Sequence, residues 1–509
     1  MAASALSRRN FLQVLGAGTV GGAISSTAAP GFSQPGASHH FARLFPKLPP
    51  FAAPSEQLTV ALVDMGRAGG IMDAQDDLSA GPAALIVDAG LNLTNQNAAR
   101  PGATAGTTFM GQFMDHDMTF DAGSRLNVPT NPHSARNTRT PAFDLDSVYG
   151  RGPLADPQLY DAGRTKLRIE SCGPFEDLPR GDDNRAVIAD PRNDENLVIA
   201  GLQSAFILFH NRAVDYLGAS RRRRTDATAL MEDARRLVTR HYHWIILHEI
   251  LPSFIGDARA AALLNARRPH LHGTNPAMPV EFQGAAYRFG HSIVRPSYRA
   301  NLAGDNGGPF FAMIFDPAAD GHPDPSDLRG GCRAARRFIG WQTFFDFNDG
   351  EVKPRKRIDT KISTPLFNLP LGAIASGAPP TSLAQRNLLR HITWGLPSGQ
   401  EIARELGAPA LSAGDLDELA GYGLGLERST PLWYYVLKEA EIFENGEYLG
   451  PLGAAIVGEV IVGLIEADRA SFLSEDPGWQ PTLPSASPGT FRMTDLLSFA
   501  GVAPANRGQ

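Results

Sequence analysis

The chain has 509 residues, of which 43% are hydrophobic, so it is long enough to bury a large core and to form roughly two to four domains. This composition excludes an intrinsically disordered protein. The formal net charge of -6 gives no overall basic field, which argues against a nucleic-acid partner.

The N-terminus has the features of an export signal. Arg8 and Arg9 precede a short, glycine-rich apolar run that ends in small residues, and a stretch rich in proline, glycine and serine follows. This order is typical of a twin-arginine signal, and the run is too short and too often interrupted by glycine to span a membrane. An ordinary amphipathic first helix is the alternative. We expect residues 1–32 to direct export to the periplasm or the cell exterior.

Polar groups gather in the apolar stretch GQFMDHDMTFD, residues 111–121. On a helix, Gln112, Asp115 and His116 lie on one face, whereas Asp117 is turned aside. Buried polar groups need partners or a ligand to offset the loss of water. A core histidine with satisfied hydrogen bonds is the simplest alternative, but three polar groups directed at one point favour a ligand site.

The loop TPAFDLDSVYG, residues 140–150, offers oxygen atoms at alternate positions. Thr140, the carbonyl group of Ala142, Asp144 and Asp146 could wrap a hard cation, in a loop that lacks the glycine spacing of an EF-hand. An Asx-turn with solvated acidic side chains is the alternative, and it would be preferred if the loop stood alone.

The segment DPRNDEN, residues 190–196, precedes a predicted helix. Arg192 and Glu195 lie three residues apart in it, close to the helix start, where an acidic side chain suits the helix dipole. Taken alone, this spacing indicates an ordinary ion pair.

The body of the chain, residues 33–509, is predicted to be one large, mainly α domain. Apolar residues three and four apart predict buried helices at 196–217, 233–251 and 453–468. Alternation typical of strands is sparse, and the 52 glycines and 39 prolines are spread along the chain. We therefore expect helices joined by irregular loops, with little β structure. Because twin-arginine export carries folded proteins that often hold a cofactor, a bound cofactor is also expected.

Two more polar clusters follow. His291 ends the segment YRFGH, residues 287–291, and comes after a glycine that would let another group approach closely. In NLLRHITWGLPSG, residues 387–399, Asn387 and Arg390 lie three residues apart.

Taken in order, these five motifs resemble those of the animal-type haem peroxidases of the peroxidase and cyclooxygenase superfamily, in a secreted bacterial form. The resemblance covers roughly residues 100 to 500, and five ordered motifs are far more specific than any single one. It implies a helical peroxidase domain that holds b-type haem. His291 would bind the haem iron, and Asn387 would orient its other ring nitrogen. Arg288 and Arg390 would pair with the haem propionates.

On the other face of the haem, the resemblance implies that His116 takes a proton from hydrogen peroxide and returns it to the leaving oxygen. Arg192 would stabilise the charge that develops as the O–O bond breaks and a ferryl intermediate forms. Gln112 would lie where the family holds water or a small anion. Asp115 and Glu195 match the two carboxylates that form esters with haem methyl groups.

Asn196 follows Glu195, where a subset of the family has a methionine that forms a third, sulfonium link to haem. Without this link, chloride oxidation is disfavoured, and bromide, iodide, thiocyanate or phenols are the expected donors. Asp117, next to the distal histidine, would join the loop 140–150 in a calcium site. The expected activity is therefore that of a peroxidase that reduces hydrogen peroxide and oxidises a small reducing substrate.

Two other functions stay open. A fatty-acid dioxygenase of the same superfamily would need a tyrosine three residues before the proximal histidine, where Arg288 stands. A secreted calcium-dependent adhesion protein without catalysis is the non-enzyme alternative, and retention of both His116 and Arg192 favours an enzyme. Cys172 and Cys332 lack metal-binding spacing, and whether they form a disulfide also stays open.

Overall fold

The computed structural model describes residues 39–91, 97–121, 123–220, 226–266, 269–271, 276–333, 335–374 and 376–507. They belong to the unit Gly31–Gln509, and the predicted export signal, residues 1–32, lies outside the described residues. About 47% of the structure is helical, and its sheets are few and small in the part of the chain that is described. The prediction of a mainly α fold is confirmed.

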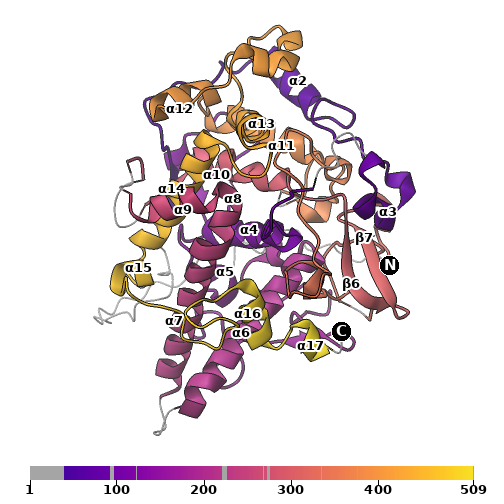
Figure 1. Cartoon of the computed structure of the whole chain (residues 1–509), viewed down its shortest axis with the longest axis vertical. Helices are drawn as coiled ribbons and strands as arrows, with labels where there is room; N and C mark the ends of the chain where they lie inside the picture. Colours follow the sequence, from indigo (N-terminus) through magenta and orange to yellow (C-terminus); the bar gives the residue numbers. More distant parts are fainter. Residues whose placement is uncertain are drawn as a thin grey trace, which may run out of the picture. The chain divides into compact units, whose positions relative to one another are not determined.

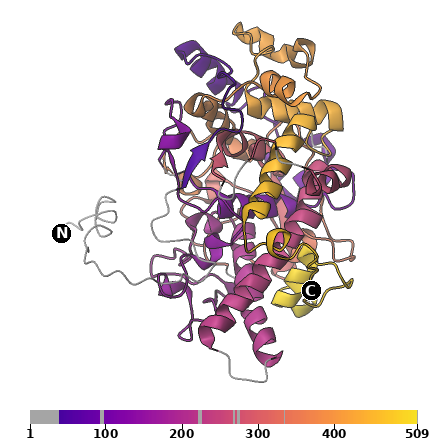
Figure 2. The ribbon, with the colours of Figure 1, turned by 90° about the vertical axis from the view of Figure 1, so that its left-hand side faces the viewer.

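Three helices pack together in the core: α4 (Ala105–Met118), α6 (Leu197–Ser220) and α7 (Ala227–Ile245). The ring of Phe113 on α4 stacks on that of Phe206 on α6, with centroids 4.6 Å apart, and both meet Tyr242 of α7 edge to face. Figures 1 and 2 show α6 and α7 running side by side below α4. The buried helix predicted at 196–217 is therefore α6.

The other two predicted helices are also present. After α7, a π-helical turn at Ile246–Ile250 leads into α8 (Leu251–Ile255), so the helix predicted at 233–251 is longer and irregular. The helix predicted at 453–468 is α14 (Pro451–Ala467). Short 3₁₀ turns join these to the remaining helices: α2 (Glu56–Met65), α3 (Pro82–Val87), α5 (Asp146–Tyr149), α9 (Asp257–Leu264), α10 (Val280–Gly284), α11 (Leu383–Trp394), α12 (Gly399–Leu406), α13 (Leu432–Glu444), α15 (Phe472–Glu475), α16 (Met493–Ala500) and α17 (Pro504–Arg507).

The strands are mostly short, and several of their side chains join the hydrophobic core. β1 (His39–Ala42) lies between β2 (Arg136–Asn137), which is antiparallel to it, and β5 (Met278–Pro279), which is parallel. β3 (Glu170–Ser171) pairs with β4 (Glu176–Asp177). β6 (Ser297–Asp305) and β7 (Gly308–Met313) form a hairpin whose turn residues, Asn306 and Gly307, both have positive φ, as a tight two-residue turn requires.

One described helix is long and apolar enough to cross a membrane by length and composition alone. It is α6, over Leu197–Ala219, and 83% of its apolar window is buried inside the fold. A helix that is apolar on all sides and covered by neighbouring helices is typical of a protein core.

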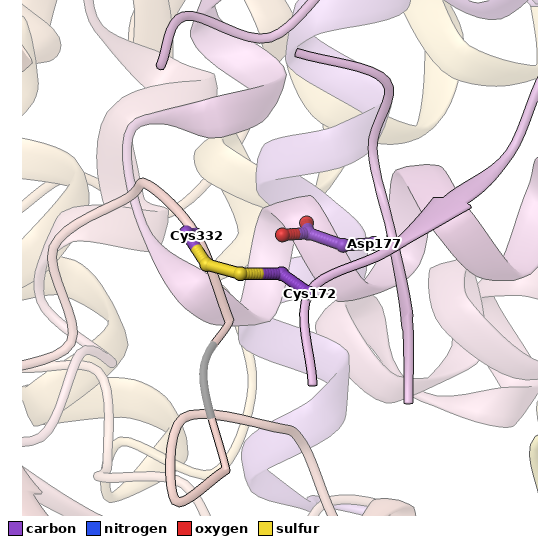
Figure 3. A group of neighbouring side chains, drawn as sticks. All are labelled: Cys172, Asp177 and Cys332. Atoms are coloured by element: carbon purple, nitrogen blue, oxygen red, sulfur yellow. A yellow bond between two sulfur atoms is a disulfide. The ribbon is translucent and has the colours of Figure 1, made fainter. Parts of the chain in front are cut away.

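A disulfide joins Cys172 to Cys332 across 160 positions of sequence, with Cα atoms 5.9 Å apart. It connects the end of β3 to a loop that follows β7 (Figure 3). The nearby Asp177 carboxylate accepts a hydrogen bond from the backbone N–H of Arg333 at 3.0 Å, which ties the same two segments together. The pairing that the sequence left open is thus present in the structure.

Candidate active site

A buried cavity brings most of the predicted site residues together. It holds about 990 Å³ of empty space when the solvent at its open side is counted. Six of the predicted residues line it: Gln112, Asp115, His116, Glu195, Arg288 and His291. The predicted residues Arg192, Asn387 and Arg390 lie behind this wall and contact its members or their neighbours.

α4 presents His116 to the cavity and holds the ring by a buried contact. Its Nδ1 lies 2.8 Å from Oδ1 of Asn193, which makes Nδ1 the donor and leaves Nε2 as the basic nitrogen. Asn193 is itself fully buried and donates from Nδ2 to Gln203 at 2.8 Å. Burial, and secondly the charge of Arg192, lowers the pKa of His116 to about 3, so the ring is neutral. Asn193 stands in the DPRNDEN motif, but its spacing gave no sign of this contact.

Two carboxylates lie beside His116 in the cavity wall. Oε1 of Glu195 lies 4.0 Å from Nε2 of His116 and accepts a hydrogen bond from the Gln112 amide. Burial raises the pKa of Glu195 to about 8. Burial also raises the pKa of Asp115, whose carboxylate lies 3.7 Å from the guanidinium of Arg192. Both carboxyl groups are therefore placed where a ligand in the cavity would meet them.

Arg192 does not reach the cavity surface in this structure. Its guanidinium makes two hydrogen bonds to Asp190, at 3.0 and 2.8 Å, and one to the carbonyl oxygen of His116 at 3.0 Å. Asp190 is fully buried and also pairs with Arg139 at 2.9 Å. Asp190 thus holds Arg192 against the backbone of His116 and within 3.7 Å of the Asp115 carboxylate, and its role in stabilising charge at the peroxide stays a prediction.

The opposite wall is built around His291. The preceding Gly290 leaves open space where a Cβ would stand, so the backbone does not crowd the cavity at this point. Nδ1 of His291 lies 2.7 Å from the side-chain amide of Asn387 on α11, the contact that the resemblance implied. Burial, and next the charge of Arg288, lowers the pKa of His291 to about 3. The oxygen of Asn387 accepts from Arg288, so its Nδ2 donates to Nδ1 of His291 and the ring proton lies on Nε2. To bind a metal ion through Nε2, His291 would have to donate from Nδ1, and the Asn387 amide would have to turn its oxygen toward the ring.

Two arginines add positive charge to this wall. Arg288 donates to the carbonyl oxygen of Gln283 and to Asn387, and among the described residues it forms no ion pair. Burial, and then the charge of Arg390, lowers the pKa of Arg288 to about 9. Arg390 instead pairs with Asp121 at 3.2 Å. A buried guanidinium that lines the cavity without a carboxylate partner fits a ligand that carries carboxylates, as haem does.

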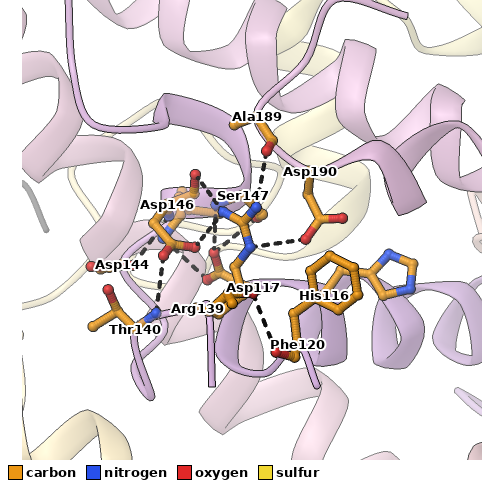
Figure 4. Close-up of polar contacts among 12 residues, drawn as sticks. His116, Asp117, Phe120, Arg139, Thr140, Asp144, Asp146, Ser147, Ala189 and Asp190 are labelled. Atoms are coloured by element: carbon orange, nitrogen blue, oxygen red, sulfur yellow. Dashed lines mark hydrogen bonds and ion pairs between the residues drawn. The ribbon is translucent and has the colours of Figure 1, made fainter. Parts of the chain in front are cut away.

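The predicted cation ligands also converge. Carboxylate oxygens of Asp117, Asp144 and Asp146 lie within 4.8 Å of one another, and the Asp117 carboxylate points toward the other two while the His116 ring points away (Figure 4). Burial, then repulsion from Asp144 and Asp146, raises the pKa of Asp117 well above its usual value. The hydroxyl of Thr140 is buried without a hydrogen-bond partner. This donor set fits a hard cation such as calcium.

Other residues of this cluster were not predicted from the sequence. The hydroxyl of Ser147 donates to Asp117 at 2.9 Å, and Arg139 lies 3.3 Å from the Asp146 carboxylate. Ala142, whose carbonyl group was predicted as a ligand, lies in the same loop and donates its N–H to the carbonyl oxygen of Thr140.

We expect the active protein to contain calcium, because three carboxylates, two of them buried and one half-buried, repel one another without a cation. Removal by a chelator should lower the melting temperature and slow the reaction with peroxide, since Asp117 directly follows His116 at the end of α4. Added Ca²⁺ should restore both, whereas Mg²⁺ should not, because it demands a smaller octahedral site. Metal analysis and melting curves measure this, and active protein without calcium would contradict it.

Comparisons with known proteins find relatives of this chain among the peroxidases. The model of the family described as animal haem peroxidase matches residues 121–311. Thyroid peroxidase of Sus scrofa is 24% identical over 388 residues, which cover 68% of this chain and 39% of that protein. Peroxidase A of Dictyostelium discoideum superposes with a TM-score of 0.58 at 16% identity, over 90% of this chain and 93% of that one. Fatty acid alpha-dioxygenase of Oryza sativa superposes with a TM-score of 0.51 at 16% identity, over 78% and 74%.

The chain resembles the animal haem peroxidases over residues 121–311, and the members of that family are oxidoreductases. It covers only 26% and 39% of the lengths of the thyroid peroxidases that it matches in Mus musculus and Sus scrofa. At 16% identity, the likeness to the two solved structures is a likeness of fold.

Proposed function

We propose that the protein binds haem in this cavity and reduces hydrogen peroxide while it oxidises a small organic donor. The observation that carries the proposal is the pair of neutral histidines on opposite walls of one cavity. Nδ1 of each ring contacts an asparagine, Asn193 for His116 and Asn387 for His291, so Nε2 is the nitrogen that can meet a ligand. For His291 this requires the Asn387 amide to present its oxygen to Nδ1. An ordinary core histidine would have both nitrogens satisfied by the protein.

The two walls suit different tasks. His291 would hold the haem iron, Arg288 would pair with a propionate, and Asp115 and Glu195 could form esters with the haem methyl groups. Bound haem would supply the electrons that reduce hydrogen peroxide and would then oxidise the donor. His116 would take a proton from hydrogen peroxide at Nε2 and return it to the leaving oxygen, which its low pKa and fixed Nδ1 permit.

The cavity favours an organic donor over a halide. Both ends of the Gln112 amide, where the family holds a small anion, are engaged, one by Glu195 and the other by Asn196. The rest of the wall is largely aliphatic or aromatic, including Ile314, Leu366 and Leu369. An apolar wall stabilises a phenol ring and offers nothing to a hydrated anion.

The purified protein should show a haem absorption band that changes on addition of hydrogen peroxide, and it should oxidise a phenol with a kcat/KM at least about tenfold above that for bromide or iodide. Leu369→Ser should lower the value for the phenol, because it adds a polar group to the wall. Leu371, which is 49% exposed and outside the lining, offers the matched control Leu371→Ser. A preference for halides over phenols would contradict the donor assignment but not the peroxidase assignment.

A fatty-acid dioxygenase is the second candidate. Tyr287 lines the cavity, with its hydroxyl donating to the carbonyl oxygen of Gly111 at 3.0 Å, and the wall is apolar enough for an acyl chain. It precedes the proximal histidine by four residues and not by three. Oxygen uptake with a long-chain fatty acid, measured against peroxide-dependent oxidation of a phenol, separates the two activities.

We also propose that the chain is exported by the twin-arginine route. The sequence around Arg8 and Arg9 supports this, and so does the disulfide between Cys172 and Cys332, since disulfides persist mainly in oxidising compartments. Replacing both arginines with lysine should leave the protein inside the cells that express it, and export of that variant at the normal level would contradict the route.

A further inference from the structure

Asn196 caps the start of α6, and the cap fixes which way its side chain points. Its Oδ1 accepts hydrogen bonds from the backbone N–H groups of Val198 and Ile199, at 3.1 and 3.0 Å. A backbone N–H can only donate, so this end of the side chain must be the oxygen. Asn196 is 2% exposed, which leaves little water to compete for either end. The helix start therefore directs the Nδ2 group away from α6.

The orientation of Asn196 determines that of the Gln112 amide, and thereby which end of Gln112 faces Glu195. Nδ2 of Asn196 donates to Oε1 of Gln112 at 3.3 Å, so the carbonyl end of Gln112 faces Asn196. The other end, Nε2, then has to face Glu195, and it donates to Oε1 of that carboxylate. Two backbone N–H groups thus determine that Glu195 meets a hydrogen-bond donor.

We propose that Asn196 is a positioning residue that turns the Gln112 amide toward Glu195 and thereby prepares Glu195 to form an ester with a haem methyl group. This inference rests on the proposed function. A hydrogen bond donated to a carboxylate favours its charged form. Here the bond from Gln112 opposes burial, which raises the pKa of Glu195.

The ester step shows why the charged form matters. An oxygen of the Glu195 carboxylate forms a C–O bond with the methyl carbon, which gives up one proton and two electrons. Hydrogen peroxide takes the two electrons with two protons and leaves as two water molecules. Carboxylate, methyl group, peroxide and one proton thus give the ester and two waters. A protonated Glu195 would first have to lose its proton inside the cavity.

The other charges around Glu195 stay in place when Asn196 is changed. The positive charge of Arg192 favours the charged form of Glu195, whereas the negative charges of Asp190 and Asp115 disfavour it. His116 lies 4.0 Å away and is neutral. Asp115 provides an internal control. It lines the same cavity, but its carboxylate pairs with Arg192 and so does not depend on the orientation of the Gln112 or Asn196 amide.

The substitution Asn196→Asp separates capping from orientation. Aspartate caps a helix as well as asparagine does, so the fold should be kept. It has no N–H to donate, and the Gln112 amide should turn its Nε2 toward the new carboxylate and its oxygen toward Glu195. Asn196→Ser keeps a capping oxygen without adding a charge, and it controls for the charge that aspartate brings.

The experiment measures the two ester links separately. Haem-loaded wild-type protein, Asn196→Asp and Asn196→Ser are treated with hydrogen peroxide and digested, and haem-bound peptides that contain Asp115 or Glu195 are quantified by mass spectrometry. In Asn196→Asp, the Glu195 link should fall about tenfold relative to the Asp115 link, since a hydrogen bond to a charged group commonly changes an equilibrium by that factor or more. Asn196→Ser should show a smaller fall. An unchanged ratio in Asn196→Asp would overturn the proposal.

A second measurement needs neither haem nor peroxide. The infrared band of the protonated Glu195 carboxyl group, assigned by difference with Glu195→Gln in each background, is followed against pH. Asn196→Asp should give Glu195 a roughly tenfold higher proton affinity than the wild type. A wild-type protein that did not react with peroxide would contradict the proposed function. The titration would still measure whether Asn196 affects the pKa of Glu195, because it needs no peroxide. Equal titration curves would overturn it.

Discussion

Replacing His291 with alanine should leave the protein without stoichiometric haem. No other histidine lines the cavity besides His116 in the described part of the chain, and Nδ1 of His116 is committed to Asn193 on the opposite side of the site. The loss should be nearly complete, because propionate pairing with Arg288 alone would have to hold the cofactor. The ratio of haem absorbance to protein absorbance after reconstitution measures it.

Two controls make this result specific. His322→Ala, at an exposed position outside the lining, should bind haem normally. Added imidazole should restore part of the haem absorbance in His291→Ala, because it can enter the space left by the side chain and bind the iron in its place. If His291→Ala bound a full complement of haem with an unchanged spectrum, the assignment of the proximal ligand would be wrong.

Helical periodicity explains how much of the site could be predicted from the sequence. In α4, Gln112, Asp115 and His116 do share the face that lines the cavity, and Asp117 does point to a different cluster. The spacing of residues on a helix fixes these directions without any tertiary contact. The same reasoning located α6 and α14, most of whose apolar residues are buried.

Contacts between distant segments could not be predicted in this way. Arg192 is held by Asp190, and Arg390 by Asp121, 269 positions away, and the motifs alone did not predict either ion pair. Asn193 meets His116 across 77 positions. Which partner a polar group finds depends on how the segments pack, and one sequence does not show that.

The same packing connects the acidic cluster to the cavity. Arg139 lies 3.3 Å from Asp146 in the cluster and 2.9 Å from Asp190 (Figure 4). Asp190 in turn pairs with Arg192, which lies 3.7 Å from the Asp115 carboxylate. These ion pairs are buried, where charges are weakly screened and loss of one partner is costly. A change in the charge of the acidic cluster should therefore alter the electrostatic environment of the Asp115 carboxylate in the cavity wall.

Replacing His116 with alanine should preserve haem binding but slow the reaction with hydrogen peroxide by about 10²- to 10⁴-fold, the usual contribution of a general acid–base group. The cofactor should remain because His291, Asn387 and Arg288 belong to the other wall. Stopped-flow absorption of the haem after mixing with peroxide measures the rate.

The slower reaction expected of His116→Ala tests proton transfer, because the substitution should leave the fold unchanged. Phe113 and Met114 keep the apolar contacts of α4 in the core, so the shortened side chain leaves the helix in place. His133→Ala, at an exposed position on the surface, should react at the wild-type rate. A weak base added to the solution should restore part of the activity of His116→Ala, because it can carry the proton that Nε2 would have taken. Wild-type reactivity in a haem-replete His116→Ala protein would remove His116 from the mechanism, since no other neutral imidazole lies in that wall of the described cavity.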